Sequence, residues 1–286
     1  MTELRLDHVL IAVRDLTATN DTFGKLGFKV TPEGRHPGRG TSNRLVVFGP
    51  EYLELISVHD PTGDLFRPNL VPFLAAREGL FIFCMGTRDI EGRVRDIRSK
   101  GVRVAEPVRG SRHAADGSTA YSWIQAEIGA SEMPGSQTFF IQHDQTVAER
   151  YTEPSDPTNH PNGVTGIFSL ALAVKNAKAA SQRWMDVFGI EKTSEGQTAD
   201  GLAKIIRLRF DNCYLDFVEP LNRGPLADFL DTHGQGPYEI TFECTDLDAT
   251  ESLFKRNRIS GLRRGTDALE VPSESARGVR MSFVQE

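Results

Sequence analysis

The chain has 286 residues, of which 39% are hydrophobic and 25% are charged, a composition typical of an ordinary globular protein of about two domains. The formal net charge of −6 disfavours a nucleic-acid-binding protein, which normally carries a basic surface. No apolar run approaches the length of about 20 residues that spans a bilayer, and the first residues lack the pattern of a secretory signal, so we expect a cytoplasmic protein.

Four segments share one plan, in which a short apolar strand ends in Asp or Asn. They cover residues 7–16, 80–90, 168–176 and 239–247. The Asp or Asn is expected to cap the helix that follows. The four expected helices cover residues 16–26, 90–100, 177–188 and 247–257. The first and third are followed by Gly27 and Gly189, and glycine there supplies the positive φ that ends a helix.

Three strand-like runs follow each helix, so that each repeat reads βαβββ. In the first repeat the runs cover residues 29–32, 44–48 and 52–58. The end of the first repeat, Phe48-x-x-x-Tyr52-Leu53-Glu54-Leu55, matches Phe210-x-x-x-Tyr214-Leu215-Asp216-Phe217 in the third. Such a match in both spacing and residue type indicates internal duplication.

A segment rich in proline and polar residues separates the repeats two and two. We therefore predict a first domain over residues 1–148, a linker over 149–165 and a second domain over 166–286. The predicted fold class is α+β, with four βαβββ modules that form two domains of curved mixed sheets with outer helices.

This pattern resembles the vicinal oxygen chelate superfamily, which includes glyoxalase I, bleomycin-resistance proteins and extradiol dioxygenases. The opening Leu6-Asp7-His8-Val9 and the run Tyr52-Leu53-Glu54-Leu55 are typical of it, and the stretch from His36 to Leu45 resembles a glyoxalase-like subgroup. The resemblance covers nearly the whole chain. It implies that two modules close around one site, but it does not fix the reaction, because one fold hosts many chemistries.

The resemblance implies a metal ligand on the first and on the last strand of each module. In the first module these positions hold His8 and Glu54, which match the family pattern and are our candidate catalytic residues. In the second module they hold Ile82 and either Phe139 or Phe140, which cannot bind a metal. Only half of the family's ligand set is therefore present in the first domain.

The second domain departs further from the family pattern. Ser169 replaces the first histidine, Asp216 keeps the acid, Glu239 opens the fourth module, and Met281 or Ser282 stands at its end. An extradiol dioxygenase of this architecture needs two His and one Glu there. This departure argues against an ordinary extradiol enzyme, so the first domain is the better candidate for the site.

His36 is the candidate third ligand. Together with His8 and Glu54, it would complete a site with two histidines and one carboxylate, which suits iron, manganese or zinc. Two alternatives stay open. The His8–Glu54 pair could be a simple hydrogen-bonded pair, and His36 could stabilise a turn beside Pro37 and Gly38.

Other residues of the same region are candidates for binding substrate. They are Arg39, Asn43, Arg44, Tyr52, Trp123 and Phe140. The arginines, with Arg35 and Arg112 nearby, favour an anionic or oxygen-rich molecule, and the aromatic residues could form a wall against a ring. Ordinary surface charge and ordinary core packing are the alternative interpretations.

The remaining cysteines and histidines are expected to have structural or surface roles. Cys84, Cys213 and Cys244 are far apart and form no C-x-x-C motif, so we expect buried reduced thiols. His143 could reach the mouth of the first-domain pocket. His59, His160 and His233 lie in polar segments and are expected at the surface.

Two functions from different classes follow. The first is an enzyme that acts on a small oxygen-rich molecule by dioxygenase, lyase or isomerase chemistry, with a divalent metal in the first domain. The second is a metal-free protein that captures a small molecule, as bleomycin-resistance proteins do, in a pocket lined partly by apolar residues. In both cases the partner is a small molecule, and neither nucleic acid nor a membrane is expected. A homodimer stays open.

Overall fold

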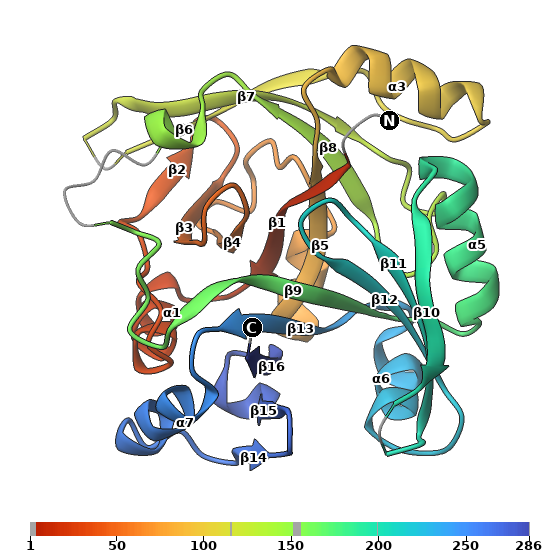
Figure 1. Ribbon diagram of the computed structural model, residues 1–286. Helices are drawn as coiled ribbons and strands as arrows, with labels where there is room; N and C mark the ends of the chain where they lie inside the picture. Colours follow the sequence, from red (N-terminus) through yellow and green to blue (C-terminus); the bar gives the residue numbers. More distant parts are fainter. Residues whose placement is uncertain (1–3, 115, 151–155, 199, 286) are drawn as a thin grey trace.

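The computed structural model describes residues 4–114, 116–150, 156–198 and 200–285 (Figure 1). The first module comprises β1 (Arg5–Ala12), α1 (Leu16–Lys25), β2 (Gly34–His36), β3 (Thr41–Val47) and β4 (Tyr52–Val58). The second comprises α2 (Leu70–Ala76), β5 (Gly79–Gly86), α3 (Ile90–Ser99), β6 (Val108–His113), β7 (Thr119–Glu127), β8 (Thr138–His143) and α4 (Val147–Arg150).

The second half of the chain repeats the plan. The third module comprises β9 (Val164–Ala173), α5 (Ala177–Phe188), β10 (Glu191–Gln197), β11 (Ala203–Arg209) and β12 (Tyr214–Pro220). The fourth comprises α6 (Pro225–His233), β13 (Gly236–Cys244), α7 (Leu247–Arg256), β14 (Arg263–Arg264), β15 (Ala268–Val271), the short 3₁₀ helix η1 (Ser273–Ser275) and β16 (Arg280–Gln285). Within the described ranges, no helix is long and apolar enough to cross a lipid bilayer.

The four predicted module helices are confirmed, and so are their caps. The side chains of Asp15, Asp89, Asn176 and Asp246 each accept a hydrogen bond from a backbone N–H in the first turn, which satisfies donors that a helix otherwise leaves free. Gly27 and Gly189 adopt φ values of 76° and 69°. The chain therefore leaves α1 and α5 in the left-handed conformation that their glycines permit.

Some elements differ from the prediction. Residues 29–32 do not form a strand, since Pro32 has no N–H to donate; the strand of this region is the short β2, which starts at Gly34. Helices α2, α4 and α6 were not predicted, because they are short, lie outside the βαβββ plan and have no long apolar period.

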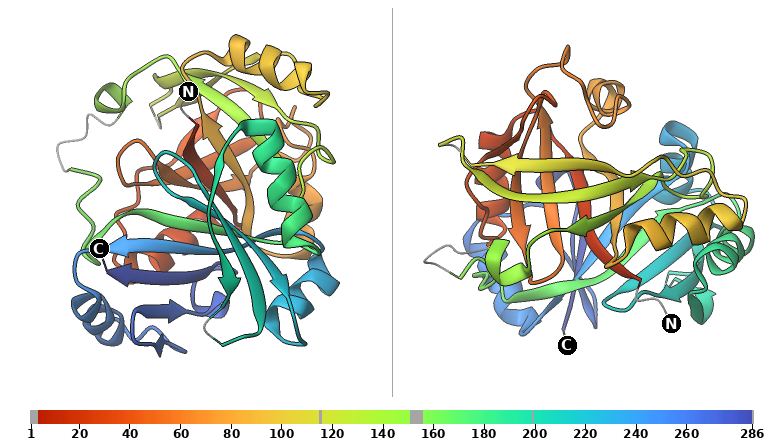
Figure 2. Two further views of the ribbon diagram at one scale, coloured as in Figure 1. Left: turned by 45° about the vertical axis from the view of Figure 1, so that its right-hand side comes forward. Right: turned by 90° about the horizontal axis from the view of Figure 1, so that it is seen from above.

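The first two modules form a closed barrel, and the last two form an open sheet (Figure 2). The barrel order is β1-β4-β3-β2-β6-β7-β8-β5, and the two modules meet where β1 pairs with β5 and where Arg35 of β2 pairs with His113 of β6. The open sheet has the order β10-β11-β12-β9-β13-β16-β15-β14. The α+β class with curved mixed sheets is thus confirmed.

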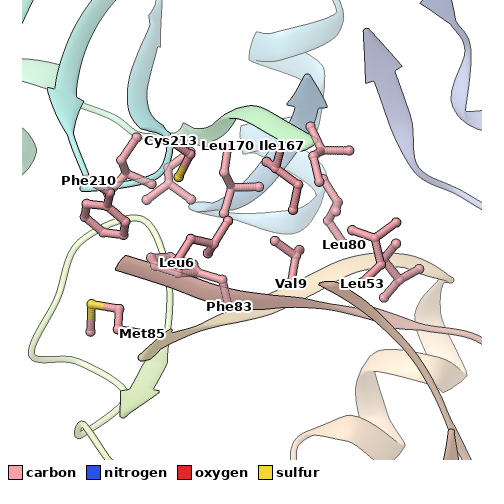
Figure 3. Close-up of a cluster of buried hydrophobic side chains, with 14 of the residues drawn as sticks. Leu6, Val9, Leu53, Leu80, Phe83, Met85, Ile167, Leu170, Phe210 and Cys213 are labelled. Atoms are coloured by element: carbon pink, nitrogen blue, oxygen red, sulfur yellow. The ribbon is translucent and has the colours of Figure 1, made fainter. Parts of the chain in front are cut away.

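The barrel and the open sheet share one hydrophobic core (Figure 3). Phe83 of β5 stacks on Trp184 of α5 with ring centroids 5.6 Å apart, and Leu170 of β9 and Phe210 belong to the same buried cluster. Burial of this apolar surface is the main force that holds the two sheets together. The three cysteines are free and buried, as predicted.

A second, smaller cluster lies inside the barrel and surrounds the polar residues. It includes Leu10, Leu45, Tyr52, Cys84 and Phe139. A register shift between Leu6 and His8 places Leu6 in the shared core, whereas His8 lines the cavity inside the barrel. A regular strand would place Leu6 and His8 on one face, but the β-bulge breaks the alternation of side chains and turns them to different faces.

Candidate functional site

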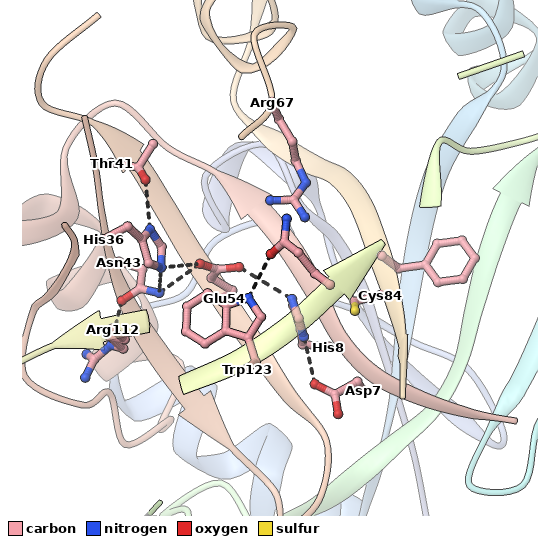
Figure 4. Close-up of polar contacts among 12 residues, drawn as sticks. Asp7, His8, His36, Thr41, Asn43, Glu54, Arg67, Cys84, Arg112 and Trp123 are labelled. Atoms are coloured by element: carbon pink, nitrogen blue, oxygen red, sulfur yellow. Dashed lines mark hydrogen bonds and ion pairs between the residues drawn. The ribbon is translucent and has the colours of Figure 1, made fainter. Parts of the chain in front are cut away.

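Three strands of the barrel bring His8, His36 and Glu54 together (Figure 4). They come from β1, β2 and β4, and their exposed fractions are 3%, 7% and 7%. The Nε2 atom of His8 lies 3.6 Å from Oε2 of Glu54, and Nε2 of His36 lies 3.7 Å from Oε1. The carboxylate thus stands between two imidazoles, and the structure brings together the three residues proposed as metal ligands.

Asp7 orients the ring of His8. Its Oδ1 lies 2.9 Å from Nδ1 of His8, and its carboxylate also contacts Arg5 and His143. Burial alone would raise the pKa of Asp7, but His143 and His8 hold it well below its usual range. An ionised carboxylate only accepts hydrogen bonds, so Nδ1 of His8 carries the proton, and in the neutral ring Nε2 presents a lone pair toward Glu54.

Asn43 links Glu54 to His36. Its Nδ2 donates to Oε1 of Glu54 over 2.8 Å and lies 3.2 Å from Nε2 of His36, while its Oδ1 accepts from Nε of Arg112 over 2.8 Å. Because Nδ2 is a donor, Nε2 of His36 accepts, and Nδ1 of His36 donates to the hydroxyl of Thr41 over 2.8 Å. The amide therefore fixes the tautomer of His36.

The electrostatics of the site keep the imidazole of His36 neutral and the carboxyl group of Glu54 ionised. Burial lowers the pKa of His36 to about 4, against the opposing effect of Glu54. Burial would raise the pKa of Glu54, but His36, His8 and the Asn43 hydrogen bond lower it below its ordinary value. At neutral pH a neutral imidazole of His36 thus lies beside the ionised carboxylate of Glu54.

This donor set fits a divalent metal in type and protonation state, because metal ligands must be deprotonated. Two atoms that each lie about 2.1 Å from one tetrahedral metal are about 3.4 Å apart, close to the His8–Glu54 separation of 3.6 Å. Within residues 4–114, 116–150, 156–198 and 200–285, no three His, Cys, Asp or Glu side chains already form a metal-binding cluster. The positions of His8 and Glu54 suit a shared metal. His36 would become a third ligand only if its Nε2 gave up the contact with Nδ2 of Asn43.

The cavity around these groups is narrow and largely aromatic. Its polar lining includes Thr41, Asn43 and Gln125, and its apolar lining includes Tyr52, Ile56, Phe66, Leu70, Tyr121, Trp123, Phe139 and Ile141. The ring of His8 stacks on Tyr52 with centroids 4.6 Å apart. The space open to water is about 30 Å³, room for only one or two water molecules. A larger ligand enters only if side chains at the edge of the cavity move.

The predicted substrate-binding residues divide into two groups. Asn43, Tyr52 and Trp123 line the cavity. Arg39 lies outside it, paired with Asp64 and placed over the ring of Phe66.

Arg44 and Phe140 point away from the cavity. Arg44 donates to the carbonyl of Thr31 over 3.3 Å, because alternation along β3 turns Asn43 and Leu45 inward and Arg44 outward. Phe140 lies in the core shared with the open sheet, where it packs against Phe188.

The second module supplies apolar groups at the positions where the family resemblance implies ligands. Ile82 and Phe139 both belong to the cluster inside the barrel. In the pairing of β5 with β8, Cys84 lies opposite Phe139, so Phe139, and not Phe140, faces the cavity.

In the open sheet the acid at the matching position is paired with an arginine. Asp216 receives two hydrogen bonds of 2.7 Å from Arg207, a bidentate pair that occupies both carboxylate oxygens. Glu239 accepts a hydrogen bond from Ser282 over 2.8 Å.

Two histidines lie elsewhere than expected. His160 is only 4% exposed, and its ring bonds the backbone of Lys29 and of Val47; the expectation of a surface residue was wrong, because the segment around it packs against the barrel. His143 is not among the residues that line the cavity; its Nε2 instead lies 3.0 Å from Oδ1 of Asp7.

Sequence reasoning missed several residues that line the cavity, among them the polar Arg67 and Gln125. Arg67 follows β4 in a segment without periodicity, so no pattern placed it. Gln125 shares an inward face with Trp123 of β7, and the period of two could have indicated it. Arg112, expected near the rim, is 7% exposed and stands behind Asn43.

Comparison with known proteins agrees with this architecture. The model of the glyoxalase-like domain matches residues 6–188, and that of the glyoxalase/bleomycin resistance protein/dioxygenase superfamily matches residues 169–270. No curated protein sequence matches the chain significantly.

Several solved structures share the fold. A hypothetical protein from Staphylococcus aureus is 16% identical, with a TM-score of 0.72 over 99% of this chain and 100% of that one. A triple mutant of 4-hydroxymandelate synthase from Streptomyces coelicolor is 13% identical, with a TM-score of 0.72 over 100% of this chain and 93% of that one.

A fusion of a xylose isomerase-like TIM barrel with 4-hydroxyphenylpyruvate dioxygenase is also similar, with 13% identity and a TM-score of 0.62 over 100% of this chain and 49% of the fusion. At these identities the likeness shows the fold alone. The module repeats, the barrel and the matched family model, which covers more than half of the sequence, lead to one conclusion: the chain belongs to the glyoxalase-like domain family of the vicinal oxygen chelate superfamily.

Proposed function

We propose that the barrel is the active site of an enzyme that acts on a small oxygen-rich molecule, with a divalent metal (iron, manganese or zinc) held by His8, Glu54 and His36. The observation that carries this proposal is the approach of two imidazole Nε2 atoms to the two oxygens of one buried carboxylate, at 3.6 and 3.7 Å. A bound metal would supply a Lewis acid for two vicinal substrate oxygens. Dioxygenase, lyase and isomerase chemistry all remain candidates.

The protein's own groups have distinct tasks in this proposal. Asp7 holds His8 in one tautomer through the 2.9 Å contact with Nδ1, and Asn43 holds the carboxylate of Glu54 through a bond of 2.8 Å. Tyr52 and Phe139 pack against His8 and exclude water from it, which strengthens electrostatic interactions at the site. Where no metal is bound, Glu54 is the group best placed to accept a substrate proton.

Elemental analysis of the purified protein tests the proposal. We expect about one iron, manganese or zinc per chain when the protein is prepared with each metal, and loss of that metal in His8→Ala, Glu54→Ala and His36→Ala. The exposed His59 offers a matched control, since His59→Ala should keep the metal. Metal that persists in the His8 and Glu54 variants, or a wild-type protein that takes up none, would overturn the metal assignment.

A metal-free binding protein is the alternative, and one observation favours it. Asn43 donates toward both His36 and Glu54, so its amide already satisfies lone pairs that a metal would need. In this alternative the apolar side chains of Ile82 and Phe139 inside the barrel help to form a cavity that binds a ligand and does not convert it. Ligand binding that survives complete metal removal, without turnover of any diol, catechol or α-keto acid tested, would support it.

A further inference from the structure

Arg67 is a buried cation that lines the cavity, and no sequence pattern predicted it there. It lies between β4 and α2, its side chain is 8% exposed, and it lines the cavity with Phe66 and Leu70. Figure 4 shows its guanidinium above the centre of the site, on the side away from Arg112. Buried arginine is rare unless its charge is compensated, so its partners decide what it does.

Those partners leave the guanidinium incompletely satisfied. One nitrogen donates to Oε1 of Glu127 over 2.9 Å, and the group lies 3.8 Å above the ring of Phe139. The Nε atom of Arg67 and the Oε2 atom of Glu127 are both buried without a hydrogen-bond partner in the described structure. The ion pair thus involves only one carboxylate oxygen of Glu127 and leaves the Nε donor of Arg67 unused.

The same chain shows what a purely structural arginine–carboxylate pair looks like. Arg207 and Asp216 form two parallel hydrogen bonds of 2.7 Å each, which is the geometry that best satisfies both groups. Arg67 and Glu127 do not adopt it. The guanidinium of Arg67 has unused donors, rests on an aromatic ring and faces the cavity. It can therefore bind a second planar anion.

We infer that Arg67 binds a carboxylate group of the substrate, so that the substrate class is small oxygen-rich carboxylic acids. This inference rests on the proposed function of the barrel. Phe139 supports Arg67 and also contacts His8 in a T-shaped arrangement with ring centroids 5.5 Å apart. One ring thus touches both the group that would anchor the carboxylate and a candidate metal ligand. A second buried cation, Arg112, donates to two neutral acceptors, the side chain of Asn43 and the carbonyl of Pro32, and adds positive potential nearby.

Glu127 is the group that a substrate carboxylate would compete with. It stands at the end of a row on β7 in which Trp123 donates to Gln125 over 2.8 Å and Gln125 donates to Glu127 over 3.2 Å. Both hydrogen bonds to Glu127 end on Oε1, while its buried Oε2 has no partner among the described residues, and burial raises the pKa of Glu127. The arrival of a substrate anion at Arg67 therefore displaces a weakly held partner.

Calorimetric titration of the full-length, EDTA-treated protein with glycolate tests the inference, with neutral glycolamide as the probe of equal size. We expect glycolate to bind at least about tenfold more tightly than glycolamide, the ratio that a charge-assisted hydrogen bond supplies. Arg67→Met should abolish this preference, and Arg67→Lys should retain part of it. Arg77→Met is the matched control, since Arg77 also lies over a phenylalanine, Phe73, but outside the cavity.

Glu127→Gln supplies a variant that does not remove the arginine, and we expect it to bind glycolate more tightly than the wild type. Equal affinity for glycolate and glycolamide in the wild type, or an unchanged preference in Arg67→Met, would overturn the inference. If Arg67→Met fails to fold by circular dichroism, Arg67→Lys and Glu127→Gln decide. The metal content of the same preparations, measured before EDTA treatment, separates the two proposals. A normal metal content without a preference for glycolate overturns only the role of Arg67. A preference for glycolate without bound metal overturns only the metal assignment.

Discussion

The Nδ1 atom of His8 lies 2.9 Å from the Oδ1 atom of Asp7, although the two residues are neighbours in one strand. Adjacent side chains of a regular strand point to opposite faces. The register shift beside His8 relaxes this rule and lets a carboxylate support the ring from its own strand. The motif Asp-His in the first strand thus holds both a candidate ligand and the group that orients it.

Asp7→Asn should weaken metal binding by about 10- to 100-fold, because the outer partner of a ligating histidine sets its tautomer and basicity. A titration with zinc against a competing chelator measures the affinity. Asp216→Asn is the matched control, since it breaks a buried ion pair in the second domain and should leave metal affinity unchanged. Equal affinity in the wild type and in a folded Asp7→Asn protein would contradict the role given to Asp7.

Asn43→Leu should lower the free energy of unfolding by about 2–3 kcal/mol, because it strands three buried polar groups at once. These are the partners of the Asn43 amide: His36, Glu54 and Arg112. Urea unfolding followed by circular dichroism measures the change. Asn222→Ala, in an exposed turn, should change stability by less than about 0.5 kcal/mol. A loss no larger than that of the control would show that the amide network contributes little.

Gly34→Ala should destabilise the barrel, whereas Gly24→Ala should stabilise the protein. A Cβ atom at Gly34 would lie 2.2 Å from Cζ of Arg112, so the guanidinium would have to leave Asn43. A Cβ atom at Gly24, inside helix α1, meets nothing within 4 Å, and alanine there should add about 0.5–1 kcal/mol. Melting temperatures of the two variants decide, and a tolerated alanine at position 34 would show that Arg112 has freedom to move.

Acidification should destabilise the fold already between about pH 6.5 and about pH 4. Burial lowers the pKa of both His36 and His160 to about 4, so in this window the unfolded chain binds protons that the folded chain does not. Stability from these neutral imidazoles is fully present above the unfolded pKa of about 6.5 and is lost as pH falls. Each contributes a slope of up to about 1.4 kcal/mol per pH unit.

Urea unfolding at pH 7 and pH 5 checks this expectation, since the carboxyl groups with lowered pKa contribute mainly below that range. His160→Gln should reduce the pH dependence, and His59→Gln, which replaces an exposed histidine, should not. An identical pH dependence in His160→Gln and the wild type would indicate that His160 is protonated in the folded protein.

Local chemistry made much of the fold predictable. Each helix start followed from a side chain that caps it, as at Asp15 and Asn176, and each module followed from the repeat of that signal. The closure of one sheet and the openness of the other could not be predicted in this way. They depend on the pairing of β2 with β6, in which Arg35 lies opposite His113, 78 positions further along the chain. Such long-range contacts have no signature in local periodicity.

The candidate site was predictable where strand position decides orientation, and not elsewhere. His8 and Glu54 were located from the family pattern, and both line the cavity. Arg44 was wrongly assigned to the site because the prediction relied on its charge and ignored that alternate side chains of β3 point outward. Arg67 was missed because it lies in a loop, where side-chain orientation follows no regular period. The choice between Phe139 and Phe140 needed the strand register, which only the structure supplies.

The core common to the barrel and the open sheet has a consequence for how the protein comes apart. Trp184 of α5 is buried against Phe83 of β5, so neither sheet can lose its structure while the other keeps its apolar surface covered. The barrel and the open sheet resemble two subunits joined by a linker, so the effective concentration of each at the other does not fall on dilution. Denaturation of the whole chain in one cooperative step, with a midpoint independent of protein concentration, is the behaviour that such an intramolecular pairing produces.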